Sequence, residues 1–242
     1  MDWLLTAGVV SGAAFIASLI AAVAGFGGAV IMLPVLVWAF GVRDSIPLLT
    51  VAQLMGNLSR VWLNRTELDM AVVRRFAVGA VPTAILGGIV FATAPAGVLV
   101  RVLGVFLLLT VGYRHTAWGK RARITLRGFT VLGAVSAFIS AIVGSVGPFM
   151  APFFLAYGLL KGAYIGTEAL ATVVMHVTKL GVYGGYSLLT VRVVAVGIAI
   201  GLVMFVGSWL GKRLLDKVPE RLFPYIIEGV LVVAGLLFLI RG

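Results

Sequence analysis

Long apolar runs separated by short polar stretches make up almost the whole chain. A helix that crosses a bilayer needs about 20 residues, and most of the runs approach that length. We delimit ten runs, five in each half: 4–24, 29–40, 45–63, 74–93, 98–113, 128–143, 148–160, 165–186, 192–211 and 222–240. The pattern predicts an all-α polytopic membrane protein.

Two of the runs, 29–40 and 148–160, are too short to cross a bilayer comfortably. At the rise of an α-helix each would reach only about 18–20 Å. Each follows a glycine-containing turn, and the two turns lie 119 residues apart: Gly25-Phe26-Gly27-Gly28 and Gly144-Ser145-Val146-Gly147. Irregular backbone persists at membrane depth only where it is buried in protein or lines a wet cavity. We therefore predict that the second segment of each half is a half-helix entered through its glycine turn.

The basic residues indicate how the segments are oriented, because cytoplasmic loops are enriched in lysine and arginine. If the first two segments form an out-and-back hairpin, the basic loops all face the cytoplasm: Arg60 to Arg75, Arg114 to Arg127, Lys161, and Lys212 to Arg221. Both termini then lie outside, and the second half runs upside down relative to the first. We expect two inverted repeats of about five segments each, 1–113 and 128–242, joined by a cytoplasmic linker at 114–127 within one membrane domain.

Composition supports a chain without a soluble domain. The residues are 62% hydrophobic and 11% charged, and the mean hydropathy is +1.16, whereas soluble domains are about 25% charged. The absence of cysteine excludes disulfides and thiolate chemistry. The net charge of +11 fits cytoplasmic loops facing anionic lipid, so we expect the bilayer and no nucleic acid as partner. No cofactor or metal is expected.

Polar side chains recur inside matching runs at the spacing of the glycine turns. In each run they stand at i, i+4 and i+7 and share one helix face: Gln53, Asn57 and Arg60 in the first half, Thr172, His176 and Lys179 in the second. A cation in a membrane helix costs about 2.5–3.5 kcal/mol, so such residues are rare and usually functional. Half-helix N-termini favour negative charge. We expect a small anionic substrate near the midplane, with Arg60 at the cytoplasmic mouth and Lys179 at the outer mouth.

Less specific roles stay open for these residues. The glycines could serve only close helix packing, and Arg60 and Lys179 could extend from near helix ends into the polar interface. Glu168 and Glu228 are the acids within apolar runs. Either could carry a coupling proton or belong to a buried structural pair, and Glu168 could also be a mouth residue or a partner for a lysine.

The glycine turns and the helices after them resemble the sulfite exporter TauE/SafE family of membrane permeases over nearly the whole chain. The first turn is followed by Pro34 and the helix at 52–57, and the second, with Pro148, by Pro152 and the helix at 171–176. The resemblance implies a bacterial or archaeal inner-membrane permease for sulfite, organosulfonates such as sulfoacetate, or related anions. Ser145-Val146 departs from the pattern, which more often has a further glycine, and this bears on the substrate more than on the fold.

Three functions fit these features. The favoured one is a secondary transporter, an exporter of a small sulfur-containing or organic anion by alternating access around a midplane site. An anion channel could use the same pore. An intramembrane serine hydrolase would pair Ser145 with His176, yet Phe26 and Asn57 hold the matching places in the first half, so we do not expect an enzyme. The coupling ion and the oligomeric state, a homodimer included, stay open.

Overall fold

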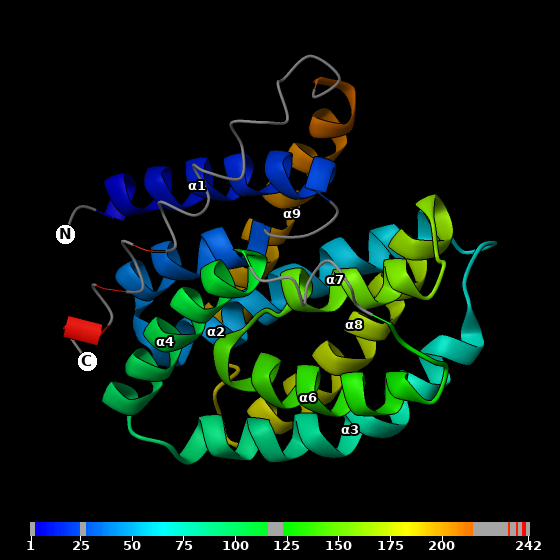
Figure 1. The fold of residues 1–242 in the computed structure, drawn as a ribbon. Coiled ribbons are helices and arrows are strands. Elements are labelled where there is room, and N and C mark those ends of the chain that lie inside the picture. Colours follow the sequence, from blue (N-terminus) through cyan, green and yellow to red (C-terminus); the bar gives the residue numbers. More distant parts are fainter. Residues whose placement is uncertain are drawn as a thin grey trace.

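The structure is a computed structural model that describes residues 3–24, 28–115 and 123–214, and residues 232, 236, 239 and 240 near the C-terminus. Within these ranges it contains eight α-helices and no strand, in the arrangement of Figure 1: α1 (Trp3–Ala24), α2 (Gly28–Leu63), α3 (Met70–Thr93), α4 (Ala96–His115), α6 (Gly128–Val143), α7 (Gly147–Ala156), α8 (Lys161–Gly185) and α9 (Val191–Leu214). The predicted all-α architecture is confirmed.

The helices follow the predicted runs closely, with one difference in α2. The runs 29–40 and 45–63 belong to one assigned helix, in which Gly41 has φ 75° and ψ 164° and produces a kink. Glycine reaches this left-handed conformation without a steric penalty. A single residue therefore separates two helical pieces where a longer polar connection was expected. Most of the run 222–240, the turn Gly25 to Gly27 and residues 116–122 of the linker lie outside the described residues.

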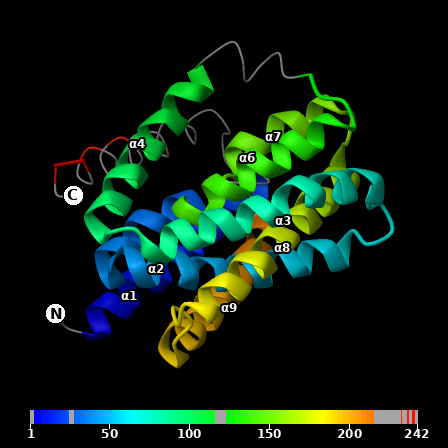
Figure 2. The same ribbon diagram turned by 90° about the horizontal axis from the view of Figure 1, so that it is seen from below.

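Each long helix packs along a specific neighbour. In Figures 1 and 2, α3 lies beside α6, and α1 lies against α9. α2 contacts both α8 and α9, and α8 also contacts α3. The contact between α2 and α8 lies at the centre of this arrangement and carries the polar faces described below.

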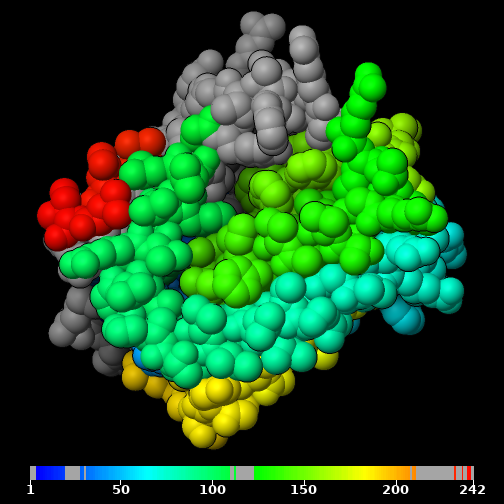
Figure 3. Space-filling view, turned by 60° about the horizontal axis from the view of Figure 1, so that its bottom comes forward, coloured from blue at the N-terminus to red at the C-terminus, as the bar shows by residue number. Residues whose placement is uncertain are grey.

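Glycines bring α3 and α6 unusually close together. A Cβ added to Gly79 would lie 1.9 Å from the carbonyl oxygen of Thr130, and one on Gly133 would lie 2.2 Å from that of Phe76. The two helices form adjacent bands on the face drawn in Figure 3. Small residues commonly allow such close backbone approach in membrane proteins, where apolar burial alone does not draw helices together.

We expect Gly79→Ala to destabilise the fold by about 1–3 kcal/mol, because the added methyl group overpacks the seam between α3 and α6. The measurement is thermal unfolding of the purified protein in detergent. Gly8→Ala is the matched control, since Gly8 lies on an exposed face of α1 and a Cβ there meets no described atom within 4 Å. Equal melting temperatures for the two variants would contradict a tightly packed seam.

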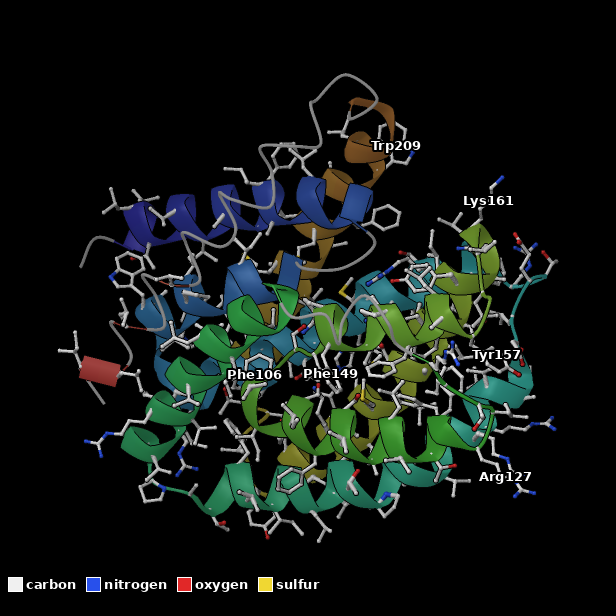
Figure 4. The ribbon with its side chains drawn as sticks, viewed as in Figure 1. Phe106, Arg127, Phe149, Tyr157, Lys161 and Trp209 are labelled. Atoms are coloured by element: carbon white, nitrogen blue, oxygen red, sulfur yellow. The ribbon has the colours of Figure 1, made fainter. Side chains whose placement is uncertain are left out.

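Several basic loops lie at one end of the helices. Arg127 precedes α6, Tyr157 follows α7 and Lys161 begins α8, and all three lie on the right of Figure 4. The connection between α2 and α3 lies at the same end, where the amide of Asp69 donates to the hydroxyl of Thr167 on α8 at 2.9 Å. Arg127, Lys161 and the connection between α2 and α3 thus lie at one end of the described helices.

Two of the described helical stretches are long and apolar enough to cross a membrane by length and composition, Ile31–Leu63 and Met70–Thr93. Shorter apolar stretches lie in α1, α4, α6, α7 and α9. α6 has 16 residues and α7 has 10, both below the length of about 20 residues that a crossing needs.

Candidate functional site

One face of α8 carries a track of buried polar side chains. They recur every three or four residues and are each exposed by 9% or less: Tyr164, Glu168, Thr172, His176, Lys179 and Tyr183. From the first to the last the helix rises about 28 Å, close to the roughly 30 Å of a hydrocarbon core. Such a track needs partners on the neighbouring helices, because buried polar groups are normally hydrogen-bonded.

The predicted polar face of α2 packs against this track. Asn57 is buried, with 1% exposed, while the side chain of Arg60 is 35% exposed at the end of the helix. The charge of Arg60 acts on both Glu168 and His176 of α8. The structure therefore brings together the two polar faces that the sequence placed on separate helices.

Arg60 and Glu168 form the ion pair that links the faces. The guanidinium Nη1 lies 3.8 Å from Oε2 of Glu168, and the hydroxyl of Thr172 donates to Oε1 at 3.3 Å. Glu168 thus pairs with an arginine of the other half and not with a lysine. With 5% of its surface exposed, it is also more deeply placed than a residue at a mouth.

Several buried polar atoms on α2, α6 and α8 have no hydrogen-bond partner among the described residues. They are Oδ1 of Asn57, both ring nitrogens of His176, and the hydroxyls of Tyr164 and Ser136. Leaving a buried polar group unpaired costs about 1–3 kcal/mol. Unpartnered atoms on the packed polar faces of α2 and α8 are expected where a ligand or ordered water supplies the missing partners.

The second glycine turn lies directly beside α2. Gly144 ends α6 with φ 87°, and its carbonyl accepts a hydrogen bond of 3.1 Å from Nε2 of Gln53. Ser145 and Val146 are buried, and Gly147 begins α7. The bond to Gln53 places the turn, and with it the N-terminus of α7, next to the polar face of α2. The first N–H groups of a helix have no partner within that helix, so those of α7 are available there.

Lys179 lies elsewhere than expected. It is fully buried, with 0% exposed, and its ammonium donates to the carbonyl oxygen of Ser140 at 3.3 Å and to its hydroxyl at 3.0 Å. One turn further along α8, the hydroxyl of Tyr183 donates to the carbonyl of Ala141. The cation predicted at the outer mouth thus lies against the last turn of α6, just before Gly144, where a helix C-terminus favours positive charge.

Four of the polar residues around this site were not singled out from the sequence: Tyr164, Ser136, Ser140 and Tyr183. The signal for the two tyrosines was available, because they continue the three- and four-residue spacing of α8 in both directions from His176. The serines of α6 carry no such signal, since serine is common in membrane helices.

The remaining sequence candidates divide into three groups. Thr172 is buried on the track and bonded to Glu168, and Gly28 is buried at the start of α2. Gly25, Phe26, Gly27 and Glu228 lie outside the described residues. Ser145 and His176 do not form the hydrogen bond of a catalytic dyad, because neither ring nitrogen of His176 has a partner in the described ranges.

A long helical chain with packed polar faces on two helices, one of which buries charged residues, belongs to the class of helical membrane proteins that conduct or carry polar solutes. The model of the sulfite exporter TauE/SafE family matches residues 10–238. The match covers most of the 242 residues, so the chain belongs to this family and the resemblance seen in the sequence is confirmed. The family is one of membrane transporters that export sulfite and related sulfur anions. Comparisons with curated proteins and with solved structures gave no significant match.

Proposed function

We propose that this protein is a secondary transporter that exports a small sulfur-containing or organic anion, such as sulfite or an organosulfonate, by alternating access. The observation that carries the proposal is the cluster of unpartnered, buried polar atoms on Asn57 and His176, flanked by the cations Arg60 and Lys179. An oxyanion would accept a hydrogen bond from an N–H of the His176 ring and would face the two positive charges, and a water molecule bound with it would donate to Oδ1 of Asn57.

The donors spread along the polar faces of α2 and α8 suit a compact oxyanion. Arg60 offers a planar guanidinium and Lys179 an ammonium with three N–H groups, two of which bond Ser140. The amide of Asn57 and the ring of His176 add neutral donors. The N-terminus of α7 after Ser145 adds backbone N–H groups and a favourable helix dipole. Gln53, through its bond to Gly144, ties this turn to the rest of the site.

Two inverted repeats, 1–113 and 128–242 with the linker 114–127, are supported by the pattern of helix contacts. At a spacing of 119 residues, α1 corresponds to α6, α3 to α9, and the second part of α2 to α8. The contact of α1 with α9 then corresponds to that of α6 with α3, and the contact of α2 with α9 to that of α8 with α3. A molecule with pseudo-twofold symmetry has this pattern of paired contacts.

The opposite orientation of the repeats is supported by the course of the helices. α1 begins on the side marked N in Figure 1, whereas α6 begins at the opposite side beside Arg127 in Figure 4. α7 returns to the end from which α6 starts, so the turn at Gly144 lies inside the protein. We infer that α6 and α7 form an out-and-back hairpin, with α7 as the half-helix, in the plasma membrane and with both termini outside.

The test is binding and flux of the purified full chain. In a thermal-shift screen against sulfite, sulfate, thiosulfate, sulfoacetate and carboxylates, we expect at least one sulfur anion to stabilise the protein. At about 100 times the dissociation constant the expected gain is about 2.7 kcal/mol. In liposomes, the same anion on the far side should accelerate uptake of its radiolabelled form.

Each outcome of this test has a definite meaning. No stabilisation by any sulfur anion and no flux would contradict the proposed function. Flux that neither saturates nor responds to anion on the far side would replace the transporter with an anion channel.

A further inference from the structure

We propose that Glu168 is an internal ligand of Arg60 that the transported anion displaces, and that Glu168 takes up one proton as each anion binds. This inference rests on the transport function proposed above and adds to it a proton that is bound together with the anion and the residue that takes up this proton.

The first support is that the carboxylate of Glu168 already forms the ion pair with Arg60 that a bound anion would form. It is buried beside the partly exposed Arg60, at the end of α2 where a solute from the loop side would first meet a positive charge. Within the chain it therefore fills the place of a negatively charged ligand.

The second support is that this internal ligand is held loosely. Nη1 of Arg60 and Oε2 of Glu168 are 3.8 Å apart, whereas charge-assisted hydrogen bonds between such groups measure about 2.7–2.9 Å. The hydroxyl of Thr172 donates to the carboxylate at 3.3 Å, which is also long. A competing oxyanion that approaches Arg60 more closely can therefore replace Glu168.

The third support is the balance of charge, because the single positive charge of Arg60 would face two negative charges. A bound oxyanion and the Glu168 carboxylate would be neighbouring negative charges in a buried site, and such pairs resist ionising together. Uptake of a proton removes one of the two charges. The O–H bond forms on the Glu168 carboxylate with a proton from water at the partly exposed end of the site, and the anion takes over the ion pair with Arg60.

The fourth support is a partner for the protonated acid. The hydroxyl of Tyr164 is buried one turn from Glu168 on α8, has no hydrogen-bond partner among the described residues, and is close enough for the two groups to interact electrostatically. A neutral carboxylic acid has an O–H to donate, and the oxygen of Tyr164 can accept it. The released acid can thus be satisfied inside the protein.

The other ionisable groups near this end of α8 are engaged or exposed. The carboxylate of Asp69 accepts from the amides of Ala71 and Val72 at the start of α3. Glu67, in the connection from α2, is exposed and lies against Gly162. Further along α8, His176 lies near Arg60 and Lys179, and it is the competing proton acceptor that the experiment must separate from Glu168.

The test is calorimetric titration of the purified full chain with thiosulfate and with methanesulfonate, neither of which changes charge between mildly acidic and mildly alkaline pH. Repeating each titration in two buffers of different ionisation enthalpy counts the protons taken up. We expect about one proton per anion at alkaline pH, with affinity falling up to about tenfold per pH unit there. Glu168→Gln should take up none and bind with pH-independent affinity, whereas the exposed control Glu67→Gln should behave as wild type.

The titrations give different results if this inference is wrong and if the proposed function is wrong. Binding without proton uptake by the wild-type protein overturns the role of Glu168 and leaves anion transport standing, and this count needs no variant to fold. Proton uptake that persists in Glu168→Gln and disappears in His176→Asn overturns it in favour of the histidine. Absence of binding by both anions and by every sulfur anion of the screen overturns both proposals together.

Discussion

Replacing Arg60 with glutamine is expected to reduce anion flux into proteoliposomes at least about 30-fold. Truncating one partner of a charged pair in a binding site costs about 2–5 kcal/mol, and the lower end applies because Arg60 is partly exposed. The loss follows because glutamine keeps some hydrogen bonding but no charge to attract an anion. Uptake of radiolabelled thiosulfate, with its dependence on concentration, measures the effect.

The single substitution also leaves Glu168 buried without its cation, which destabilises a protein strongly when both groups are charged. The double variant Arg60→Gln with Glu168→Gln removes both charges and should restore thermal stability without restoring flux. Arg65→Gln is the matched control, because Arg65 is exposed and lies over the ring of Trp62 at 4.7 Å. Wild-type flux in the double variant would remove Arg60 from the anion site.

Replacing Lys179 with methionine is expected to reduce flux strongly while leaving the melting temperature near that of the wild type. In the described part of the chain the ammonium bonds Ser140 and has no carboxylate partner. Removing a buried cation without a counter-charge recovers desolvation free energy, which offsets the two lost hydrogen bonds. The transported anion, in contrast, loses a charge within the site, and flux should fall by about tenfold or more, or about 1.4 kcal/mol.

Lys161→Met is the control for this substitution, since Lys161 is exposed at the start of α8 (Figure 4). It should retain both flux and stability. A Lys179→Met protein that melts well below the wild type yet transports at the normal rate would contradict our assignment. Lys179 would then serve only to hold the C-terminal end of α6 before Gly144.

The sequence predicted the helices of this protein well because the signal for them is local. α6 and α3 lie close to the apolar runs 128–143 and 74–93, since the hydropathy of a segment decides whether it enters a bilayer whatever its neighbours are. The connection around Gly41 was the exception. The apolar runs left residues 41–44 between two segments, yet Arg43 and Asp44 are helical, and the guanidinium of Arg43 donates to the carbonyls of Ala92 and Ala94.

The candidate site was predicted in part for a similar reason. Spacing alone placed Asn57 with Arg60 on one face, and His176 with Lys179 on another, because the period of an α-helix fixes which residues share a face. Spacing does not decide which helix a face meets. The pairing of Glu168 with Arg60, and the bonds from Lys179 to Ser140, both depend on contacts between distant segments.

The sequence by itself determined that this is an all-α membrane protein of the sulfite exporter TauE/SafE family, and it determined which residues its polar faces contain. Hydropathy and helical period suffice for that, since both are properties of short segments. Only the tertiary structure decided that Lys179 is buried against α6 and that Glu168 forms an ion pair with Arg60. The physical reason is that a buried polar group must find its partner on another helix, and the close packing of small residues such as Gly79 and Gly133 sets how those helices meet.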